Sequence, residues 1–590
     1  MSIKEERMDR AAVLHIPLSQ YAFAKSEHTL VIRIRAKKED LSGCDLYYAD
    51  RACRKTPIEF YRIPMHVCAE DACFQYYEAE IHSVYNRICY YFKLMKGQEW
   101  IYYYGDRFTE TLADFYLGDQ VVDGRSEYYQ YPIILKEEIP DVPEWFKTAV
   151  VYNIFPDSFA SGKRSLENRA EEKRLEDGRT CRSRLGGTLR GIRENLDYIQ
   201  GMGFTCLYLN PVFSGGEYHK YDVLDYYHID PCLGTEADFQ ELVEELHRRG
   251  MKIIIDGVFN HCSWEFFAFE DVAAKGRASR YCKWFYGLEF PVRKPENADE
   301  VPNYTCFAYE RRMPKLNTAE REVQIYFADV GAYWLQKYHV DGWRLDVANE
   351  IDRNFWRSFR SAVKSVDPDA VLIGEVWENA ETWLRGDAFD STMNYEFRRT
   401  CRDYLAAGSP DGRSAACQFE QMRLRYPTNI VNGQLNLIDS HDVPRFLSLC
   451  RGDLGKWKMA CILLMLMPGV PSLFYGDERK IQGILENEYR KGMAWEEKED
   501  VCDFVRELIR IRKEYIDGST GYHPVWGMIR SGVFAFAREN AGCEITAVMN
   551  PGEACAVPEM GDRRILLEKG CREGWIDQGG YAVWLRDKGR

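Results

Sequence analysis

The feature that most limits what this chain can fold into is an alternation of short apolar segments with helical patterns from about residue 149 onward. The apolar segments span residues 149–155, 205–210, 252–257, 341–346, 370–375, 391–395, 434–439 and 471–475. Between them, apolar residues recur at helical spacing, most clearly over 236–250 and 319–339. Eight strands that alternate with helices predict an α/β fold of the (β/α)8 barrel type.

Two further regions flank the expected barrel domain, which covers residues 126–518. Residues 1–125 carry short alternating segments separated by polar turns, a pattern typical of a β-sandwich. Residues 519–590 return to strand patterns and predict a small C-terminal all-β domain. Within the barrel, the stretch from about 262 to 318 is too long for a plain connection, so we expect an inserted subdomain there.

The charge and the cysteines exclude several classes of function. A net charge of −14 with interspersed acidic and basic residues argues against a nucleic-acid or anionic-membrane partner. The first twenty residues carry charges where a signal peptide needs an apolar run, and the longest apolar stretch, 460–474, is too short to cross a bilayer. Nineteen cysteines without paired CxxC spacing indicate reduced thiols in a cytoplasmic protein. Cys68 and Cys73 could begin a metal clip, but two further ligands are missing nearby, and we expect neither a metal nor a cofactor.

Polar residues gather where four of the predicted strands end. In a barrel, the C-terminal ends of the strands meet at one mouth. A single carboxylate at such a position often caps the following helix, but four of them with an arginine and two histidines are hard to explain as caps. These candidate site residues are Asp256, Asn260, His261, Arg344, Asp346, Glu375, His441 and Asp442.

Arg344 and Asp346 stand two residues apart, so the period of a strand places them on one face. Taken alone, the pair could be a structural salt bridge, although desolvation can cancel the Coulomb gain of a buried one. Cleavage of an acetal offers another reason, because it needs a proton donor and an ionised carboxylate. A neighbouring arginine favours the charged form of a carboxylate. We therefore interpret Arg344 as the residue that keeps a nucleophile ionised.

Four stretches of the sequence resemble the α-amylase family of glycoside hydrolases: "DGVFNH" (256–261), "GWRLDVANE" (342–350), "GEVW" (374–377) and "DSHD" (439–442). The resemblance implies that Asp346 is the nucleophile, Glu375 the general acid/base and Asp442 the third carboxylate, which grips sugar hydroxyls. It also implies substrate-binding roles for further residues, namely Tyr221, His261, Arg344, Trp377, His441, Glu486 and Arg490. Tyr221 could instead be a core tyrosine, and Glu486 with Arg490 could be a salt bridge in an exposed loop.

The subfamily is indicated by "MPKLN" (313–317) and by "VANE" (347–350), which resemble neopullulanases, cyclomaltodextrinases and maltogenic amylases. That resemblance implies a retaining α-glucan hydrolase that cleaves α-1,4 bonds in cyclodextrins, maltooligosaccharides or pullulan, with α-1,6 cleavage and transglycosylation as possible extensions. An exo-acting α-glucosidase of the same family is the alternative. A non-catalytic carbohydrate-binding or scaffold protein is a further alternative, against which the intact acidic residues count.

Two departures from the family pattern and one aromatic surface give further expectations. Lys163 and Arg164 stand where relatives often have calcium ligands, so we expect no calcium site there, and Ser440 replaces the usual asparagine before His441. The N-terminal strands carry runs of aromatic residues, of which alternate members should be buried and the others exposed. These are Tyr90, Tyr91, Trp100, Tyr102, Tyr103 and Tyr104. Exposed rings mark contact surfaces, and the resembling enzymes pair through this region, so we expect a homodimer or larger assembly.

Overall fold

A computed structural model describes residues 7–297, 300–408, 411–497, 500–558, 561, 563–572 and 574–589. The chain forms two compact units. The first comprises Met1–Asp141 together with Arg413–Val431, and the second comprises Val142–Gly412 together with Asn432–Arg590. Each unit is described below by itself.

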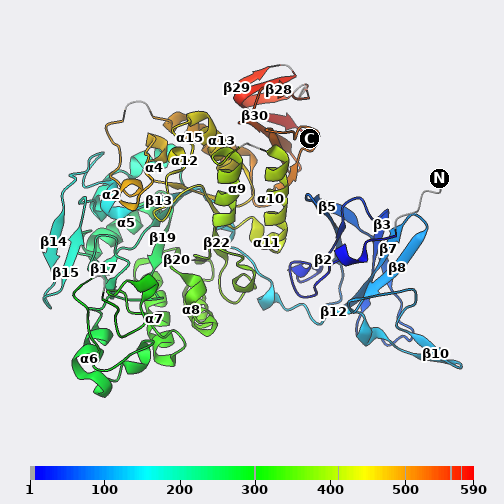
Figure 1. Cartoon of the computed structure of the whole chain (residues 1–590), viewed down its shortest axis with the longest axis horizontal. Helices are drawn as coiled ribbons and strands as arrows, with labels where there is room; N and C mark the ends of the chain where they lie inside the picture. The colour runs from blue at the N-terminus through cyan, green and yellow to red at the C-terminus, as the bar shows by residue number, and fades with distance from the viewer. Residues whose placement is uncertain are drawn as a thin grey trace. The chain divides into compact units, whose positions relative to one another are not determined.

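The second unit is built around a closed barrel of eight strands, and the predicted fold class is confirmed. In order around the barrel, the strands are β13 (Val151–Ile154), β16 (Cys206–Leu209), β19 (Lys252–Gly257), β20 (Gly342–Leu345), β21 (Val371–Gly374), β22 (Ser391–Asn394), β23 (Leu435–Leu437) and β24 (Val470–Phe474). All neighbouring pairs are parallel, and seven of the eight predicted segments contain a whole strand, whereas β24 begins one residue before the eighth. The strands read as continuous apolar runs because both faces of a parallel barrel are covered. Figure 1 shows β19, β20 and β22 inside a ring of helices.

Helices fill the connections between these strands. The principal ones are α3 (Leu189–Glu194), α4 (Leu196–Met202), α5 (Glu236–Arg248), α7 (Arg321–Tyr338), α8 (Arg353–Val366), α9 (Tyr395–Leu405), α13 (Leu454–Leu466) and α15 (Cys502–Tyr515). Local chemistry sets their ends: Thr235 and Asp238 form a capping box at the start of α5, and Asp352 accepts hydrogen bonds from the first backbone N–H groups of α8. Of the described helices, none combines the length and apolar character that crossing a bilayer requires.

The long connection from β19 to α7 contains α6 (Phe267–Lys275) and three 3-10 turns, η4 (Gly276–Ala278), η5 (Cys282–Trp284) and η6 (Phe307–Tyr309). It has aromatic packing of its own, since Phe269 lies edge-on to Phe285 and Tyr304. Two smaller hairpins precede it: β14 (Glu171–Arg174) with β15 (Thr180–Ser183), and β17 (Phe213–Gly215) with β18 (Val223–Ile229).

The chain ends in a six-stranded sheet made of β25 (Gly521–Pro524), β26 (Phe534–Glu539), β27 (Cys543–Asn550), β28 (Cys555–Ala556), β29 (Arg564–Arg572) and β30 (Trp575–Asp587). Arg538 of β26 fastens this sheet to the barrel. Its guanidinium donates to the carbonyl of Leu466 at the end of α13 (2.7 Å) and to the carbonyls of Thr520 and Gly521 (2.9 Å each). Arg512 of α15 binds the neighbouring carbonyls of Met465 (2.7 Å) and Gly469 (2.6 Å). Two buried arginines thus satisfy the free carbonyls at the C-terminus of α13.

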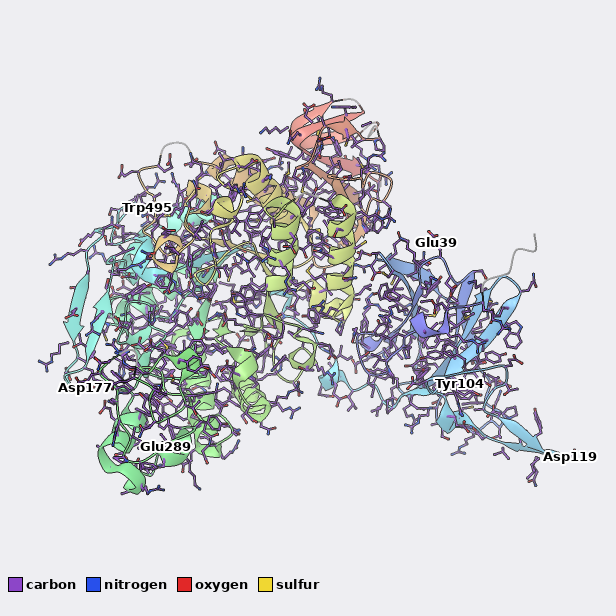
Figure 2. The ribbon with its side chains drawn as sticks, in the orientation of Figure 1. Glu39, Tyr104, Asp119, Asp177, Glu289 and Trp495 are labelled. Atoms are coloured by element: carbon purple, nitrogen blue, oxygen red, sulfur yellow. The ribbon has the colours of Figure 1, made fainter. Side chains whose placement is uncertain are left out.

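The first unit contains two facing sheets, as expected for a β-sandwich. One has the order β1-β2-β6-β5 and the other β4-β3-β7-β8-β9, with β12 beside β7. Their bounds are β1 (Ala22–Ser26), β2 (Thr29–Lys37), β3 (Gly43–Asp50), β4 (Tyr61–Pro64), β5 (His66–Glu70), β6 (Phe74–His82), β7 (Ile88–Lys96), β8 (Glu99–Tyr104), β9 (Arg107–Thr109) and β12 (Tyr129–Tyr131). A separate hairpin, β10 (Phe115–Leu117) with β11 (Gln120–Val122), turns at Asp119, which Figure 2 labels.

Helices α10 (Gly412–Leu424) and α11 (Thr428–Val431) group with the sandwich although they follow α9 of the barrel. Leu424 packs in a cluster with Tyr21, Ala69 and Tyr76. Arg33 of β2 also donates to the hydroxyl of Thr428 over 3.1 Å. The sequence analysis did not foresee this association.

The expectation that the sandwich strands expose alternate aromatic rings was wrong. Tyr90, Tyr91, Tyr103 and Tyr104 are all at most 5% exposed, Tyr102 is half-buried, and of the six only Trp100 is exposed. Tyr90 faces the core, where His15 and Tyr129 meet it. Tyr91 lies on the other face of the sheet, where Phe60 and Tyr128 cover it. Those covering residues lie outside the strand patterns, which is why the pattern predicted exposure.

Candidate active site

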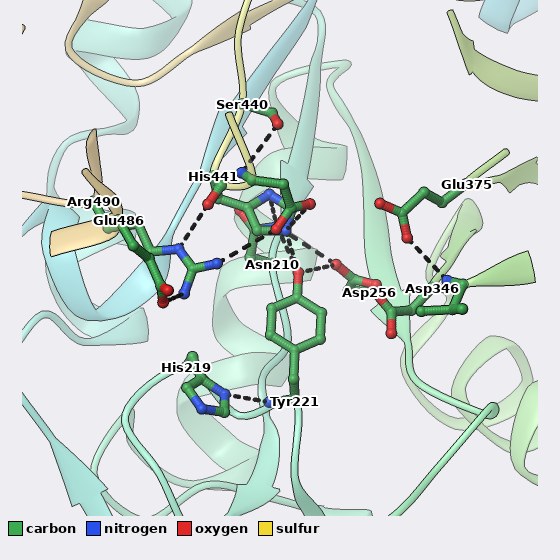
Figure 3. Close-up of polar contacts among 12 residues, drawn as sticks. Asn210, His219, Tyr221, Asp256, Asp346, Glu375, Ser440, His441, Glu486 and Arg490 are labelled. Atoms are coloured by element: carbon green, nitrogen blue, oxygen red, sulfur yellow. Dashed lines mark hydrogen bonds and ion pairs between the residues drawn. The ribbon is translucent and has the colours of Figure 1, made fainter. Parts of the chain in front are cut away.

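The predicted site residues gather at the C-terminal ends of the barrel strands, around a pocket of about 520 Å³. Of the twelve predicted residues, eight line the pocket, and the other four, Asp256, Asn260, Arg344 and His441, are buried at 0–1% exposure. The eight lining residues are Tyr221, His261, Asp346, Glu375, Trp377, Asp442, Glu486 and Arg490. Figure 3 shows how most of the group lies.

Arg344 is the centre of the charge network. Its Nη1 donates to Asp346 Oδ1 over 2.8 Å and to Asp256 Oδ1 over 2.9 Å. Its Nη2 lies 2.9 Å from Glu375 Oε1 and 3.6 Å from Asp442 Oδ2. Register explains the first contacts, because Asp256 on β19 is paired with Arg344 on β20 and Asp346 follows directly on the same face. One guanidinium therefore holds four carboxylates around it.

The pKa values follow from burial and from this shared charge. Burial raises the pKa of Asp346, and the nearby charges of Glu375 and Asp256 add to the rise while Arg344 opposes it. Burial acts in the same direction on Asp442, but His441, Arg344 and Arg490 outweigh it and hold the pKa of Asp442 below its ordinary value. The two carboxylates of this site thus differ in the direction of their pKa shift.

Glu375 is held by two donors. The backbone N–H of Val347 donates to Oε2 over 2.9 Å, and Trp377 Nε1 donates to Oε1 over 3.1 Å. Val347 has the left-handed conformation (φ 45°, ψ 43°), which is strained for a β-branched residue. Such strain collects at functional sites. Here it directs an N–H from the residue after Asp346 toward the carboxylate of Glu375.

A second network surrounds His441. Its Nε2 lies 2.9 Å from Asp442 Oδ2 and 2.5 Å from the hydroxyl of Tyr221, and its Nδ1 lies 2.8 Å from Asn210 Nδ2. The Tyr221 hydroxyl also donates to Asp256 Oδ2 over 3.0 Å, and its ring lies parallel to the imidazole at 9° (Figure 3). Tyr221 is thus a pocket residue and not part of the apolar core.

Arg490 forms the ion pair with Glu486 that the alternative named, but the arginine is only 7% exposed and also contacts the site. Its Nε donates to the carbonyl of His441 over 2.7 Å, and its Nη2 lies 3.4 Å from Asp442 Oδ1. Glu486 pairs with the same guanidinium but keeps over half of its side chain exposed, and it accepts a hydrogen bond from the hydroxyl of Tyr218. Both residues line the pocket, and the exposed part of the Glu486 side chain is accessible to a ligand there.

Aromatic rings form the remaining walls. Trp377 stacks on Tyr395 with centroids 3.9 Å apart, and 44% of its surface is exposed. His261 stacks on Phe307, and burial with the nearby charge of Lys315 lowers the pKa of His261 to about 3. The Nε2 atom of this neutral ring is buried and has no partner among the described residues.

The sequence analysis missed several residues of the site. His219 and Phe307 line the pocket, and burial lowers the pKa of His219 to about 3. Asn210 and Tyr208 support His441 and Asp256 from behind. Asn210 is the last residue of the predicted strand segment 205–210, so its place at a strand end was a usable signal. Nothing in the pattern marked Phe307.

The described residues contain no cluster of His, Cys, Asp and Glu arranged to hold a metal ion. Shortly before Lys163 and Arg164, the carboxylate of Asp157 is 1% exposed and is bound by donors of the chain itself. It accepts hydrogen bonds from the hydroxyl of Ser183 and from the backbone N–H groups of Arg184, Leu185 and Gly186.

The mouth of this barrel holds several carboxylates, a buried guanidinium and neutral histidines around a pocket with aromatic walls. This combination is that of a glycoside hydrolase. The model "Alpha amylase, catalytic domain" matches residues 153–513, and "Alpha amylase, N-terminal ig-like domain" matches residues 8–134. The chain belongs to the α-amylase family of glycoside hydrolases.

Individual relatives cover nearly the whole chain. Neopullulanase 2 of Thermoactinomyces vulgaris is 38% identical over 91% of this chain and 90% of its own. The intracellular maltogenic amylase of Bacillus subtilis (strain 168) is 33% identical over 97% of this chain and 96% of its own. A solved structure of a cyclomaltodextrinase matches with a TM-score of 0.86 at 31% identity, and covers 97% of this chain and 99% of that one.

Proposed function

We propose that this enzyme is a retaining α-glucan hydrolase in which Asp346 is the nucleophile, Glu375 the general acid/base and Asp442 the carboxylate that holds the sugar. The observation that carries the proposal is the single guanidinium of Arg344 in contact with both Asp346 and Glu375. Two carboxylates on one guanidinium lie close together, as in a retaining glycosidase, where about 5–5.5 Å separates them.

In this mechanism Asp346 attacks the anomeric carbon while Glu375 gives its proton to the departing glycosidic oxygen. A covalent glycosyl-enzyme forms, and a water molecule that Glu375 deprotonates then releases the sugar. The positive charge of Arg344 beside Asp346 favours the ionised form of the nucleophile. Asp442 and the free Nε2 of His261 line the pocket and would bind hydroxyls of the reacting ring, while His441 holds Asp442 from behind. A sugar hydroxyl in place of water gives transglycosylation.

The substrates that we propose are cyclodextrins, maltooligosaccharides and pullulan fragments, with cleavage of α-1,4 bonds. The support is the similarity over nearly the full length to proteins named neopullulanase, cyclomaltodextrinase and maltogenic amylase. An exo-acting α-glucosidase would use the same catalytic residues, and the two differ in whether glucose alone is released from chain ends.

We also propose a cytoplasmic homodimer or larger assembly. All nineteen cysteines are free thiols, which suits a reducing compartment, and one relative is named an intracellular enzyme. The hairpin of β10 and β11 carries the exposed apolar side chains of Tyr116 (69%), Leu117 (67%) and Val122 (37%). Exposed apolar groups of this kind mark contact surfaces.

The test compares β-cyclodextrin, pullulan, starch and maltotriose as substrates and follows the anomeric configuration of the first products by NMR. Retention of the α-configuration with maltose or panose-type products supports the proposal. Glucose released singly from chain ends would favour the exo-acting alternative, and inversion of configuration would refute the covalent mechanism.

Azide separates the roles of the two carboxylates. With an activated glycoside, Asp346→Ala should yield the β-glycosyl azide, because azide takes the place of the nucleophile. Glu375→Ala should yield the α-glycosyl azide, because azide then replaces water at the covalent intermediate. If Asp346→Ala gave the α-glycosyl azide and Glu375→Ala the β-glycosyl azide, the roles of nucleophile and acid/base would have to be exchanged.

A further inference from the structure

The turn that carries His219 and Tyr221 into the pocket contains a third residue with no place in the chemistry. Lys220 lies between them, is 1% exposed and does not line the pocket. Its backbone has the left-handed conformation with φ 62°. A non-glycine residue adopts that conformation only where its surroundings impose it, so something must hold Lys220 in place.

Its side chain supplies the restraint. Lys220 Nζ forms an ion pair with Asp230 Oδ2 over 2.9 Å, and these two side chains are 2% and 0% exposed. The same Nζ donates to the carbonyl of Arg182 on β15 over 2.5 Å. Asp230 is fixed in turn, because Gly215 N donates to Oδ2 over 3.0 Å and Cys232 N donates to Oδ1 over 2.9 Å.

The chain opposite the turn packs closely against it. A Cβ atom on Gly215 would lie 2.8 Å from the Cα atom of Lys220, and a Cβ atom on Gly216 would lie 2.6 Å from Asp222 Oδ2. Asp222 is itself buried and accepts a hydrogen bond from Glu217 N over 3.1 Å. Side chains 220 and 222 therefore point into the protein, which directs residue 221 the other way.

We propose that Lys220 and Asp230 are positioning residues, whose buried ion pair fixes the turn so that Tyr221 and His219 reach the pocket. The consequence for the site is direct. The Tyr221 hydroxyl meets both Asp256 and His441, and Tyr221 N donates to His219 Nδ1 over 3.0 Å. A shift of the turn would break these contacts together. This inference rests on the proposed glycosidase function.

A double-mutant cycle with Tyr221 tests the proposal in the full-length enzyme with β-cyclodextrin as the probe. If Lys220 acts through Tyr221, Lys220→Met lowers kcat/KM about 100-fold in the wild-type background, the size expected for misplacement by about 1 Å. In the Tyr221→Ala background the same substitution lowers it less than about fivefold, because coupled residues are not additive. A purely structural role would give equal losses in both backgrounds.

The matched control is Lys252→Met, which removes another lysine ion pair, with Asp341, at the opposite end of the barrel. We expect its kcat/KM within about twofold of wild type. If Lys220→Met does not fold, Lys220→Met/Asp230→Asn replaces it, since removal of both partners leaves no unpaired buried charge. Equal losses in the two backgrounds, or an unchanged kcat/KM for Lys220→Met, would overturn the proposal. A wild-type enzyme without activity on any α-glucan would instead refute the proposed function.

Discussion

Arg344 and Asp346, two residues apart at the end of β20, point to the same side, and the guanidinium of one donates to the carboxylate of the other over 2.8 Å. The same guanidinium reaches Glu375 from its other nitrogen. The pair is thus part of a charged cluster around a pocket, and this sets it apart from a structural salt bridge that stands alone.

Asp346→Asn and Glu375→Gln should each lower kcat by several orders of magnitude and leave substrate affinity largely unchanged. Each substitution removes a group whose contribution is made in the transition state. Steady-state kinetics with β-cyclodextrin measure the loss, and calorimetry of the inactive variants measures binding. A variant that kept a tenth of the wild-type kcat would show that its residue has another role.

Chelation with EDTA should change neither the melting temperature nor the activity. A calcium ion needs several oxygen ligands, whereas Lys163 and Arg164 stand in the loop and the carboxylate of Asp157 already accepts bonds from Ser183 and three backbone N–H groups. Differential scanning calorimetry with and without EDTA checks this. A fall of several degrees that added calcium reverses would place a calcium site elsewhere in the chain.

His15 should make the sandwich less stable in acid. Burial lowers the pKa of His15 to about 4, so the unfolded chain binds a proton between pH 6.5 and 4 that the folded chain does not. Above about pH 6.5 His15 is neutral in both states and does not lower the stability of the fold. Below that pH, the free energy of unfolding falls by about 1.4 kcal/mol per pH unit, until the pKa of His15 in the folded protein is reached. In the folded protein, His15 Nδ1 donates a hydrogen bond to the carbonyl of Arg33, and its Nε2 is hydrogen-bonded to the hydroxyl of Tyr90.

The comparison is between wild type and His15→Gln, which keeps a polar side chain but does not titrate. The melting temperature should fall between pH 7 and pH 5 by several degrees more in wild type than in the variant. Parallel falls would mean that His15 is protonated in the folded protein.

Arg538→Met should destabilise the second unit by about 1–3 kcal/mol, because it leaves the carbonyls of the buried residues Leu466 and Thr520 without this donor. Thermal unfolding measures the effect. Arg530→Met, which removes an exposed arginine from the same sheet region, is the control and should cost about 0.5 kcal/mol or less. Similar losses of stability in both variants would show that the hydrogen bonds of Arg538 do not stabilise the junction between the sheet and α13.

Tyr116→Ser/Leu117→Ser should convert a dimer into a monomer if the hairpin of β10 and β11 is a contact surface. Both side chains are about two-thirds exposed, at 69% and 67%, so their replacement should not disturb the fold of the sandwich. Light scattering of both proteins at matched concentrations gives the result. A wild-type monomer would refute the proposed assembly, and a dimeric variant would place the interface elsewhere.

The barrel could be predicted from the sequence because its strands are buried on both faces and therefore read as unbroken apolar runs. The placement of Asp346 and Glu375 followed from the same reasoning, since both directly follow a strand of known direction. Asn210 stands at a strand end in the same way and could have been found, whereas Phe307 could not, because no periodicity marks its contact with His261.

The aromatic strands show where pattern reasoning fails. Alternation predicts which face of a strand a residue occupies, but not whether other segments cover that face. Phe60 and Tyr128 lie outside any alternating run, yet they bury the face that holds Tyr91 and Tyr104. Coverage by irregular segments depends on contacts distant in sequence, which one sequence does not reveal.

The grouping of residues Arg413–Val431 with the N-terminal sandwich has a consequence for protein engineering. The polypeptide crosses between the two units at three places, near residues 141, 412 and 431, and not once as a tandem arrangement would. A single cut cannot release either unit whole, and truncation after the sandwich would strip Leu424 of its neighbours Tyr21 and Tyr76. A chimera that exchanges the sandwich with that of a relative must therefore carry both segments. The second segment needs two junctions within the sequence of the barrel domain.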